Sequence, residues 1–327
     1  MTWEKGTFDG KEEVIADMVP RASTAIRLKP RREIVGDVVI DSWFFGAKEL
    51  IFKKGARLIF SSAALAKRNE LFVVADTITI EDGVGTVMFQ EATPPAQGER
   101  GQAATGAGGK HPGDSGANGE DGLEGITGLT GQNSPDITMF IGSLAGQGNL
   151  EILARGGTGG EGGRGQRGGD GGAGVQGTPA QQDYRDAGWP IGKVWLPACA
   201  AGPGQGGNGG SGGKGGQGGR GGVGGNGGTV TIAAEMTKHE ILTKAISVSV
   251  DGGTGGKGGA GGPGGIGGAK GLEGQLATFC NSAGREGAPG PEGGTGLIGL
   301  DGGPGRFGPQ FVVAVDSDAL KDWFNFE

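Results

Sequence analysis

The chain has 327 residues, 80 of them glycine, and a formal net charge of −7 at pH 7. Aromatic residues make up only 6% of it, so a conventional hydrophobic core can include only part of the chain. The acidic balance disfavours a nucleic-acid binder or a binder of anionic membranes. No apolar run reaches the length of about 18 residues that predicts a membrane span.

Residues 1–32 are mixed in composition, and we expect them to form an N-terminal attachment segment with a short helix at 11–18. The residues after Met1 lack the basic and apolar pattern of a secretory signal peptide. We therefore expect the chain to be synthesised in the cytoplasm.

The segment 33–91 is expected to form an all-β base. Short β-branched or aromatic runs recur there at strand spacing, separated by turn residues such as Lys53-Lys54-Gly55 and Glu81-Asp82-Gly83. The stretches ELIFKKGARLIF and TITIEDGVGTVMF have the form of a repeated strand-turn-strand coil. We prefer a β-solenoid to a small sandwich for this base.

Glycine then recurs at intervals of three residues in a series of tracts. In chain order these tracts are 98–109, 113–131, 156–177, 206–229, 252–274 and 284–308. The fifth tract is expected to slip phase by one residue after Gly267-Gly268. Strand-like runs return between the tracts at 137–154 and 230–250, with 241–250 expected to be one strand, and residues 310–327 are expected to form a strand and an apolar tail.

A period of three is typical of extended left-handed helices of the polyproline II type. Glycine faces let such helices approach closely, so that their backbone groups can bond to neighbouring helices. We therefore predict that 92–309 forms a polyglycine-II helix bundle of antiparallel hairpins, each pairing two consecutive tracts. The mostly Gly-Gly-X tracts 156–177 and 206–229 suit interior positions, and the mostly Gly-X-Y tracts 113–131 and 284–308 suit the edges.

Three other interpretations of the glycine content fit the pattern less well. A disordered linker needs glycine but not a fixed phase. Collagen needs far more proline than the 15 residues present, and its strands are parallel. RGG-type RNA binding lacks support because the tracts contain few aromatic residues and the chain is acidic.

No arrangement of residues predicts catalysis or a cofactor. Matches to G-x-G-x-x-G carry no information at this glycine density, and no phosphate-binding G-x-x-x-x-G-K-[ST] sequence is present. His111 and His239 fit no metal-ligand spacing. We expect no enzymatic activity, no metal and no cofactor.

The loops that join paired tracts are expected to lie at the distal end of the bundle. The longest, 178–205, contains Tyr184, Trp189 and Trp195, and the loop 275–283 contains Phe279. The first hairpin contributes Lys110-His111-Pro112. Aromatic loops on a rigid scaffold are a common binding arrangement, although the same rings could instead close the end of the bundle as a small core.

Two further groups of residues have a predicted role. Cys199 and Cys280 are the only cysteines and lie one in each of these loops. A disulfide between them and two buried thiols are both compatible with the sequence. Trp323, Phe324 and Phe326 form a C-terminal apolar patch that we expect to dock on a partner or on the protein's own base.

The phased glycine tracts and the aromatic loops between them resemble the polyglycine-II adhesins at the tips of some tailed-phage tail fibres. The resemblance covers roughly residues 98–308 and implies a stacked scaffold whose distal loops contact a receptor or polysaccharide on a bacterial surface. The implied contact residues are Tyr184, Trp189, Trp195 and Phe279, and the implied place of action is outside the cell on a virion or surface assembly. In contrast to that family, strands interrupt the tracts here, and the β region at 33–91 has no match.

Two alternative functions remain. A structural subunit would polymerise through the β base or the terminal DALKDWFNFE. An ice-binding protein, like the springtail antifreeze proteins, also uses glycine-rich helices, but its ice face should be flat and uncharged. Here the third positions of the triplets include Glu161, Arg164, Asp170 and Lys214.

Overall fold

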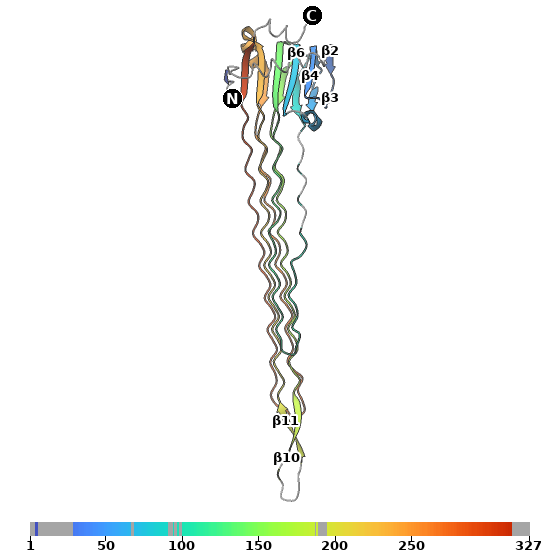
Figure 1. Ribbon diagram of the computed structural model, residues 1–327, viewed down its shortest axis with the longest axis vertical. Coiled ribbons are helices and arrows are strands. Elements are labelled where there is room, and N and C mark those ends of the chain that lie inside the picture. Colours follow the sequence, from blue (N-terminus) through green and yellow to red (C-terminus); the bar gives the residue numbers. More distant parts are fainter. Residues whose placement is uncertain are drawn as a thin grey trace.

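The computed structural model describes residues 4–5, 29–66, 69–90, 94, 97, 100–186, 188 and 195–315. Figure 1 shows two sheets at one end of an elongated molecule, a long array of extended segments, and a short ribbon at the far end. The helix expected at 11–18 lies outside the described residues.

The larger sheet has seven strands in the order β1-β14-β12-β8-β6-β4-β2, and every neighbouring pair is parallel. Its strands are β1 (Glu4–Lys5), β2 (Lys29–Ile34), β4 (Phe44–Phe52), β6 (Glu70–Ile80), β8 (Asp136–Gly146), β12 (Val230–Glu235) and β14 (Gln310–Val315). Since β2 begins at Lys29, this sheet starts before the boundary expected at residue 33.

The second sheet has five strands, also all parallel, in the order β13-β9-β7-β5-β3. They are β3 (Asp37–Ile40), β5 (Arg57–Phe60), β7 (Val84–Phe89), β9 (Asn149–Leu153) and β13 (Ile246–Ser249). The chain passes from the larger sheet to the smaller and back, and inward-facing side chains such as Leu58, Val73 and Ile152 form one fully buried core between the sheets. The expectation of a mainly β protein is confirmed.

The turns from the larger sheet to the smaller explain the spacing of the strand runs. Gly36, Gly55 and Gly83 each have a positive φ there, a conformation that side chains other than glycine rarely adopt. The expected turns Lys53-Lys54-Gly55 and Glu81-Asp82-Gly83 are two of these corners.

The strand expected at 241–250 is wrong for its first half, 241–245. Residues His239–Ala245 form helix α2, and only Ile246–Ser249 form a strand, β13. The alternating sequence AISVSVD signalled the strand correctly, but the preceding residues pack Leu242 into the core from a helix. Short 3-10 helices cover Ser62–Leu65 (η1) and Met236–Lys238 (η2).

The glycine tracts are inserted at one repeated corner of the two-sheet base. They form six extended segments, which we number in chain order: segment 1 (100–109), segment 2 (113–135), segment 3 (154–180), segment 4 (202–229), segment 5 (250–277) and segment 6 (284–309). Segments 1, 3 and 5 follow β7, β9 and β13 of the smaller sheet, and segments 2, 4 and 6 lead into β8, β12 and β14 of the larger one.

The array therefore has two layers that continue the two sheets. Backbone bonds join segments 1, 3 and 5 as parallel neighbours, and likewise segments 2, 4 and 6, whereas consecutive segments are antiparallel. The sheet register is kept: Ile137 pairs with Val230, 93 residues on, and the Ser211 N–H bonds to Asn118 Oδ1 across the same separation. The separation of 80 residues between β12 and β14 likewise recurs between Asn208 and Ala288.

The first and second positions of a triplet donate their backbone N–H groups to different neighbouring segments. In segment 4, the first-position Gly206 N–H donates to Arg285 O in segment 6, the next segment of the same layer. The second-position Gly207 N–H donates to Val175 O in the preceding segment. This assignment repeats along the array and defines the first, second and third positions of every segment.

The same positions explain why two residues in three are glycine. A Cβ on first-position Gly206 would overlap the carbonyl oxygen of Gly271 in the following segment. A Cβ on second-position Gly207 would overlap that of Asp114, two segments back. Third positions do accept side chains, and those of Lys214 and Arg220 are exposed. Segments 3 and 4 bond to segments on all sides, in agreement with the interior position expected for their Gly-Gly-X pattern.

The phase slip expected after Gly267-Gly268 does not occur in the backbone. Gly268, Gly271 and Gly274 continue to donate at intervals of three residues to Gly210, Gly207 and Gly204. Only the glycine pattern changes, because Lys270 and Glu273 replace glycine at first positions. Lys270 pairs with Glu286 of segment 6.

Substitution of neighbouring glycines tests this account. At Gly302 an alanine Cβ would overlap Gly222 O, whereas the Cβ at Gly303 meets nothing within 4 Å. We expect Gly302→Ala to lower the free energy of unfolding by about 1–3 kcal/mol. Gly303→Ala should leave it unchanged or raise it by up to about 1 kcal/mol, because alanine restricts the unfolded chain. Denaturant titration measures both, and equal effects would contradict the assigned neighbours.

Candidate functional site

The distal end of the array carries a two-stranded antiparallel ribbon. It consists of β10 (Gln181–Asp186) and β11 (Trp195–Ala201), which lie in the longest of the predicted loops. Figure 1 places this ribbon at the end of the molecule opposite the two sheets. We call the ribbon and the connection 278–283 between segments 5 and 6 the tip.

The pairing of the ribbon determines which side chains share a face. Tyr184 lies opposite Pro197, and Asp186 lies opposite Trp195. Because directly paired residues of an antiparallel ladder point to the same side and alternate along the strand, Tyr184, Asp186 and Trp195 belong to one face. Cys199, paired with Gln182, belongs to it as well.

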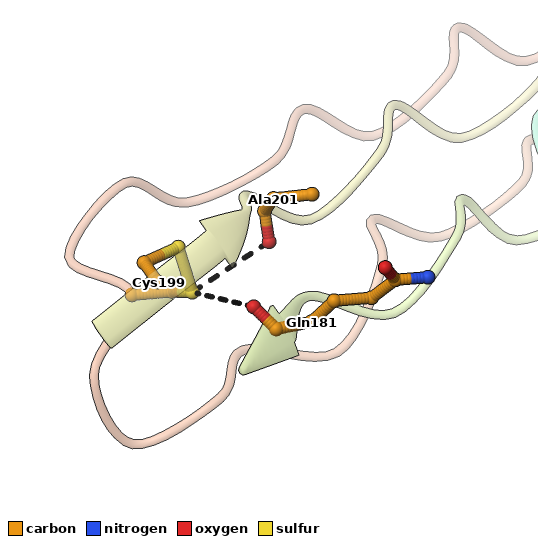
Figure 2. The surroundings of a disulfide bond; sticks show 4 residues. Gln181, Cys199 and Ala201 are labelled. Carbon is orange, nitrogen blue, oxygen red and sulfur yellow. Dashed lines mark hydrogen bonds between the residues drawn. A yellow bond between two sulfur atoms is a disulfide. The ribbon is translucent and has the colours of Figure 1, made fainter. Parts of the chain in front are cut away.

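A disulfide joins this face to the rest of the tip. Cys199 and Cys280 are bonded, with their Cα atoms 4.9 Å apart, so the ribbon is tied to the connection 278–283. The Cys280 sulfur also lies 3.7 Å from Gln181 O and 3.6 Å from Ala201 O (Figure 2). Because a disulfide sulfur carries no proton, these two approaches are packing contacts at the base of the ribbon.

The aromatic side chains of the tip are exposed. Tyr184 is 60% exposed, Trp195 58% and Phe279 47%, while Cys280 is only 5% exposed. The alternative in which these rings close the end of the array as a small core is therefore wrong for all three. Trp189 lies outside the described residues.

Sequence reasoning missed two apolar residues of this region. Leu196 on β11 is 52% exposed and Leu276, at the end of segment 5, is 55% exposed. The signal was present in the sequence, since both lie within the expected loops 178–205 and 275–283, but the prediction named aromatic residues alone.

The turn between segments 1 and 2 ends just before the ribbon begins. The Gly113 N–H bonds to Gln176 O, which places this turn beside the last triplets of segment 3. Asp114 Oδ2 accepts the N–H of His111 at 2.8 Å and that of Lys110 at 3.2 Å. The bond from the His111 N–H is the main cause that lowers the pKa of Asp114.

A lowered pKa has a defined consequence for stability. The ionised Asp114 stabilises the folded turn at neutral pH, and this contribution is lost as the pH falls through its lowered folded pKa. We expect Asp114→Asn, which keeps an acceptor oxygen but does not titrate, to lose less thermal stability between pH 7 and pH 3 than the wild type. Melting curves at the two pH values measure the difference. Identical losses in both proteins would show that Asp114 does not contribute.

The other predicted residues and features either lie outside the described residues or form no site among them. Trp323, Phe324 and Phe326 lie outside the described residues. A pocket of about 420 Å³ on the five-stranded sheet includes Arg57 and Lys244, but these pair with Asp37 and Glu240. In the described part of the chain no three His, Cys, Asp or Glu side chains gather as metal ligands, and no helix has the length and apolarity to cross a bilayer.

Removal of the disulfide should loosen the ribbon alone. With Cys199→Ser and Cys280→Ser, we expect faster proteolytic cleavage within 181–201 and little change in the circular dichroism of the whole chain, because the ribbon is almost entirely exposed. Peptide mapping after limited proteolysis measures this. Wild-type protein treated with a reductant is the matched control, and an unchanged cleavage rate in both would show that the disulfide does not hold the ribbon.

Comparisons with known proteins give little further information. No family model and no curated protein matches the chain. A solved springtail antifreeze protein from Granisotoma rainieri, described as a nine-helix polyproline type II bundle, is 27% identical over 57% of this chain and 93% of that chain. Its TM-score is 0.10, which carries no argument about fold or function.

Proposed function

We propose that this protein is a non-enzymatic recognition protein whose tip binds a receptor or polysaccharide on a bacterial surface. The observation that carries the proposal is the exposure of Tyr184 on β10, Trp195 on β11 and Phe279. The two strands lie at the end of the array most distant from the sheets (Figure 1), and Phe279 precedes Cys280, which is bonded to Cys199 of β11. Exposed aromatic side chains on a rigid scaffold supply large contact areas at a low loss of conformational entropy on binding.

The scaffold in this proposal is a polyglycine-II helix bundle on a β-solenoid base. Backbone donation at every third residue supports a helix with three residues per turn. The alternation of the chain between two parallel sheets supports a solenoid. Together they would hold the tip away from the base without a flexible linker.

The base is the proposed site of attachment to a larger particle. β1 at Glu4–Lys5 pairs with β14 at Gln310–Val315, so the described parts nearest the two chain ends meet in the sheet opposite the tip. This separation of attachment from recognition suits a protein that acts outside the cell on a virion or a surface assembly. The resemblance to phage tail-fibre adhesins supports the same assignment.

The face of the ribbon that carries Tyr184, Asp186 and Trp195 suits both classes of receptor. Tyrosine and tryptophan rings stack on sugar faces and on apolar protein surfaces alike, and the carboxylate of Asp186, opposite Trp195, accepts hydrogen bonds from hydroxyl or amide groups. The proposal therefore includes polysaccharide and protein receptors, and the binding experiment distinguishes them.

The proposed function is tested by binding to bacterial cells and to purified surface polysaccharides. We expect the variant Tyr184→Ala/Trp195→Ala to lose at least tenfold in affinity, because two exposed anchors are removed, while its circular dichroism and melting temperature stay unchanged. The matched control is Leu297→Ala/Leu300→Ala, which removes two apolar side chains of segment 6 that are more exposed than Tyr184 and Trp195.

Equal loss of binding in both variants would place the contact outside the tip. If wild-type protein binds no cell or polysaccharide in a broad panel and instead forms ordered polymers visible by electron microscopy, the recognition proposal is wrong. The protein would then be a structural subunit.

A further inference from the structure

Segment 6 differs from the interior segments in one systematic way. Its second positions are glycine, for example Gly287, Gly290 and Gly293, whose N–H groups donate to segment 5. Its first positions, which are almost all glycine in segments 4 and 5, carry side chains throughout. These residues are Glu286, Pro289, Glu292, Thr295, Ile298, Asp301, Pro304 and Phe307.

The direction of a first-position side chain follows from the rest of the array. A Cβ added at first-position Gly116, Gly156, Gly206 or Gly252 would in each case meet the backbone of the next segment in chain order. For segment 6 no next segment exists in the described chain. Its first-position side chains therefore point into the groove that a seventh segment would occupy.

The same groove carries unused donors of segment 5. In segments 3 and 4, first-position glycine N–H groups donate to the next segment of the same layer. In segment 5 the corresponding N–H groups of Gly252, Gly255, Gly261, Gly264 and Gly267 have no acceptor among the described residues. Gly258, the remaining first-position glycine of this row, donates its N–H to Asp301 Oδ1 of segment 6 at 2.8 Å. A first-position side chain of segment 6 therefore reaches into the groove.

These donors would fit only one kind of partner. They recur every third residue, at about 9.3 Å along the segment, whereas acceptors on one side of a β-strand recur at about 6.8 Å. A backbone that matches the row must itself have three residues per turn. The partner available with that repeat is another copy of this chain.

We propose that the first-position side chains of segment 6 block the open edge of the array and keep a second copy from docking there. Ile298 and Phe307 are 73% and 68% exposed and occupy the groove with bulk. Pro289 and Pro304 have no backbone N–H group to donate. Asp301 Oδ1 accepts the N–H of Gly258, one of the donors of segment 5. Charged residues and proline protect the edges of β-sheets in the same way.

The other edge of the array follows the same rule. In segment 2 the first positions are glycine, but the second positions, which would face a further segment in its layer, carry Ala117, Glu120, Leu123, Ile126 and Leu129. An association through an opened segment 5–segment 6 edge must therefore use that same edge of the second copy. Such pairing gives a closed dimer rather than a filament.

The test replaces the eight first-position residues of segment 6 by glycine and measures mass by light scattering after size-exclusion chromatography. We expect the wild type to elute with the mass of one chain and the variant with twice that mass. The matched control, Lys214→Gly/Gln217→Gly/Arg220→Gly/Val223→Gly, adds glycine at third positions and should remain single. A smaller variant, Ile298→Gly/Asp301→Gly/Pro304→Gly, serves if the larger one does not fold.

Two results would overturn the proposal. One is a folded variant that stays at the mass of one chain at high concentration. The other is a dimer of the single variant Thr295→Cys, in which segment 6 is otherwise unchanged, cross-linked through the introduced cysteine. Since neither readout involves the tip, the outcome is independent of the proposed recognition function.

Discussion

The structure depends on direct hydrogen bonding between the backbones of neighbouring glycine-rich segments. First- and second-position N–H groups reach carbonyls of adjacent segments at about 2.7–3.1 Å. Almost every such position is glycine in the interior segments, because a single Cβ would occupy the place of a neighbouring carbonyl. Each segment thus forms hydrogen bonds with several others. We therefore expect an isolated segment to be unstable.

The two sheets solve the register problem that this arrangement creates. Repetitive glycine segments have few side chains to fix their alignment, and slippage by one triplet would leave most bonds intact. Here each segment is continuous with a strand whose pairing is fixed by buried side chains such as Leu71, Ile137 and Val230. Asn118 and Asp121 reinforce the alignment, because their side chains accept third-position N–H groups of segment 4. The base therefore aligns the array, and the array carries the tip.

Much of this arrangement was predictable from the sequence. The three-residue glycine period indicated extended segments, and the difference between Gly-Gly-X and Gly-X-Y tracts indicated interior and edge positions. Tyr184, Trp195 and Phe279 were correctly expected at the distal end. These predictions succeeded because the sequence repeats report directly on which backbone faces have neighbours.

Other features were not predictable because they depend on the alignment of distant segments. The sequence alone left open the bond between Cys199 and Cys280, which depends on the lengths of segments 4 and 5. It also favoured a strand at 241–245, where packing of Leu242 into the core selects a helix. The role proposed for Ile298 and Asp301 depends on their first positions in the triplet, which are defined by hydrogen bonds between distant segments.

Amide hydrogen exchange, resolved by residue, tests the central claim most directly. In segment 4 the account predicts slow exchange at first- and second-position glycines such as Gly218 and Gly219, which donate to Leu297 O and Gly163 O. It predicts fast exchange at the third-position Gln217 and Arg220, whose N–H groups have no acceptor among the described residues. A protection pattern with a period of three would support the array, and uniformly fast exchange through 206–229 would contradict it.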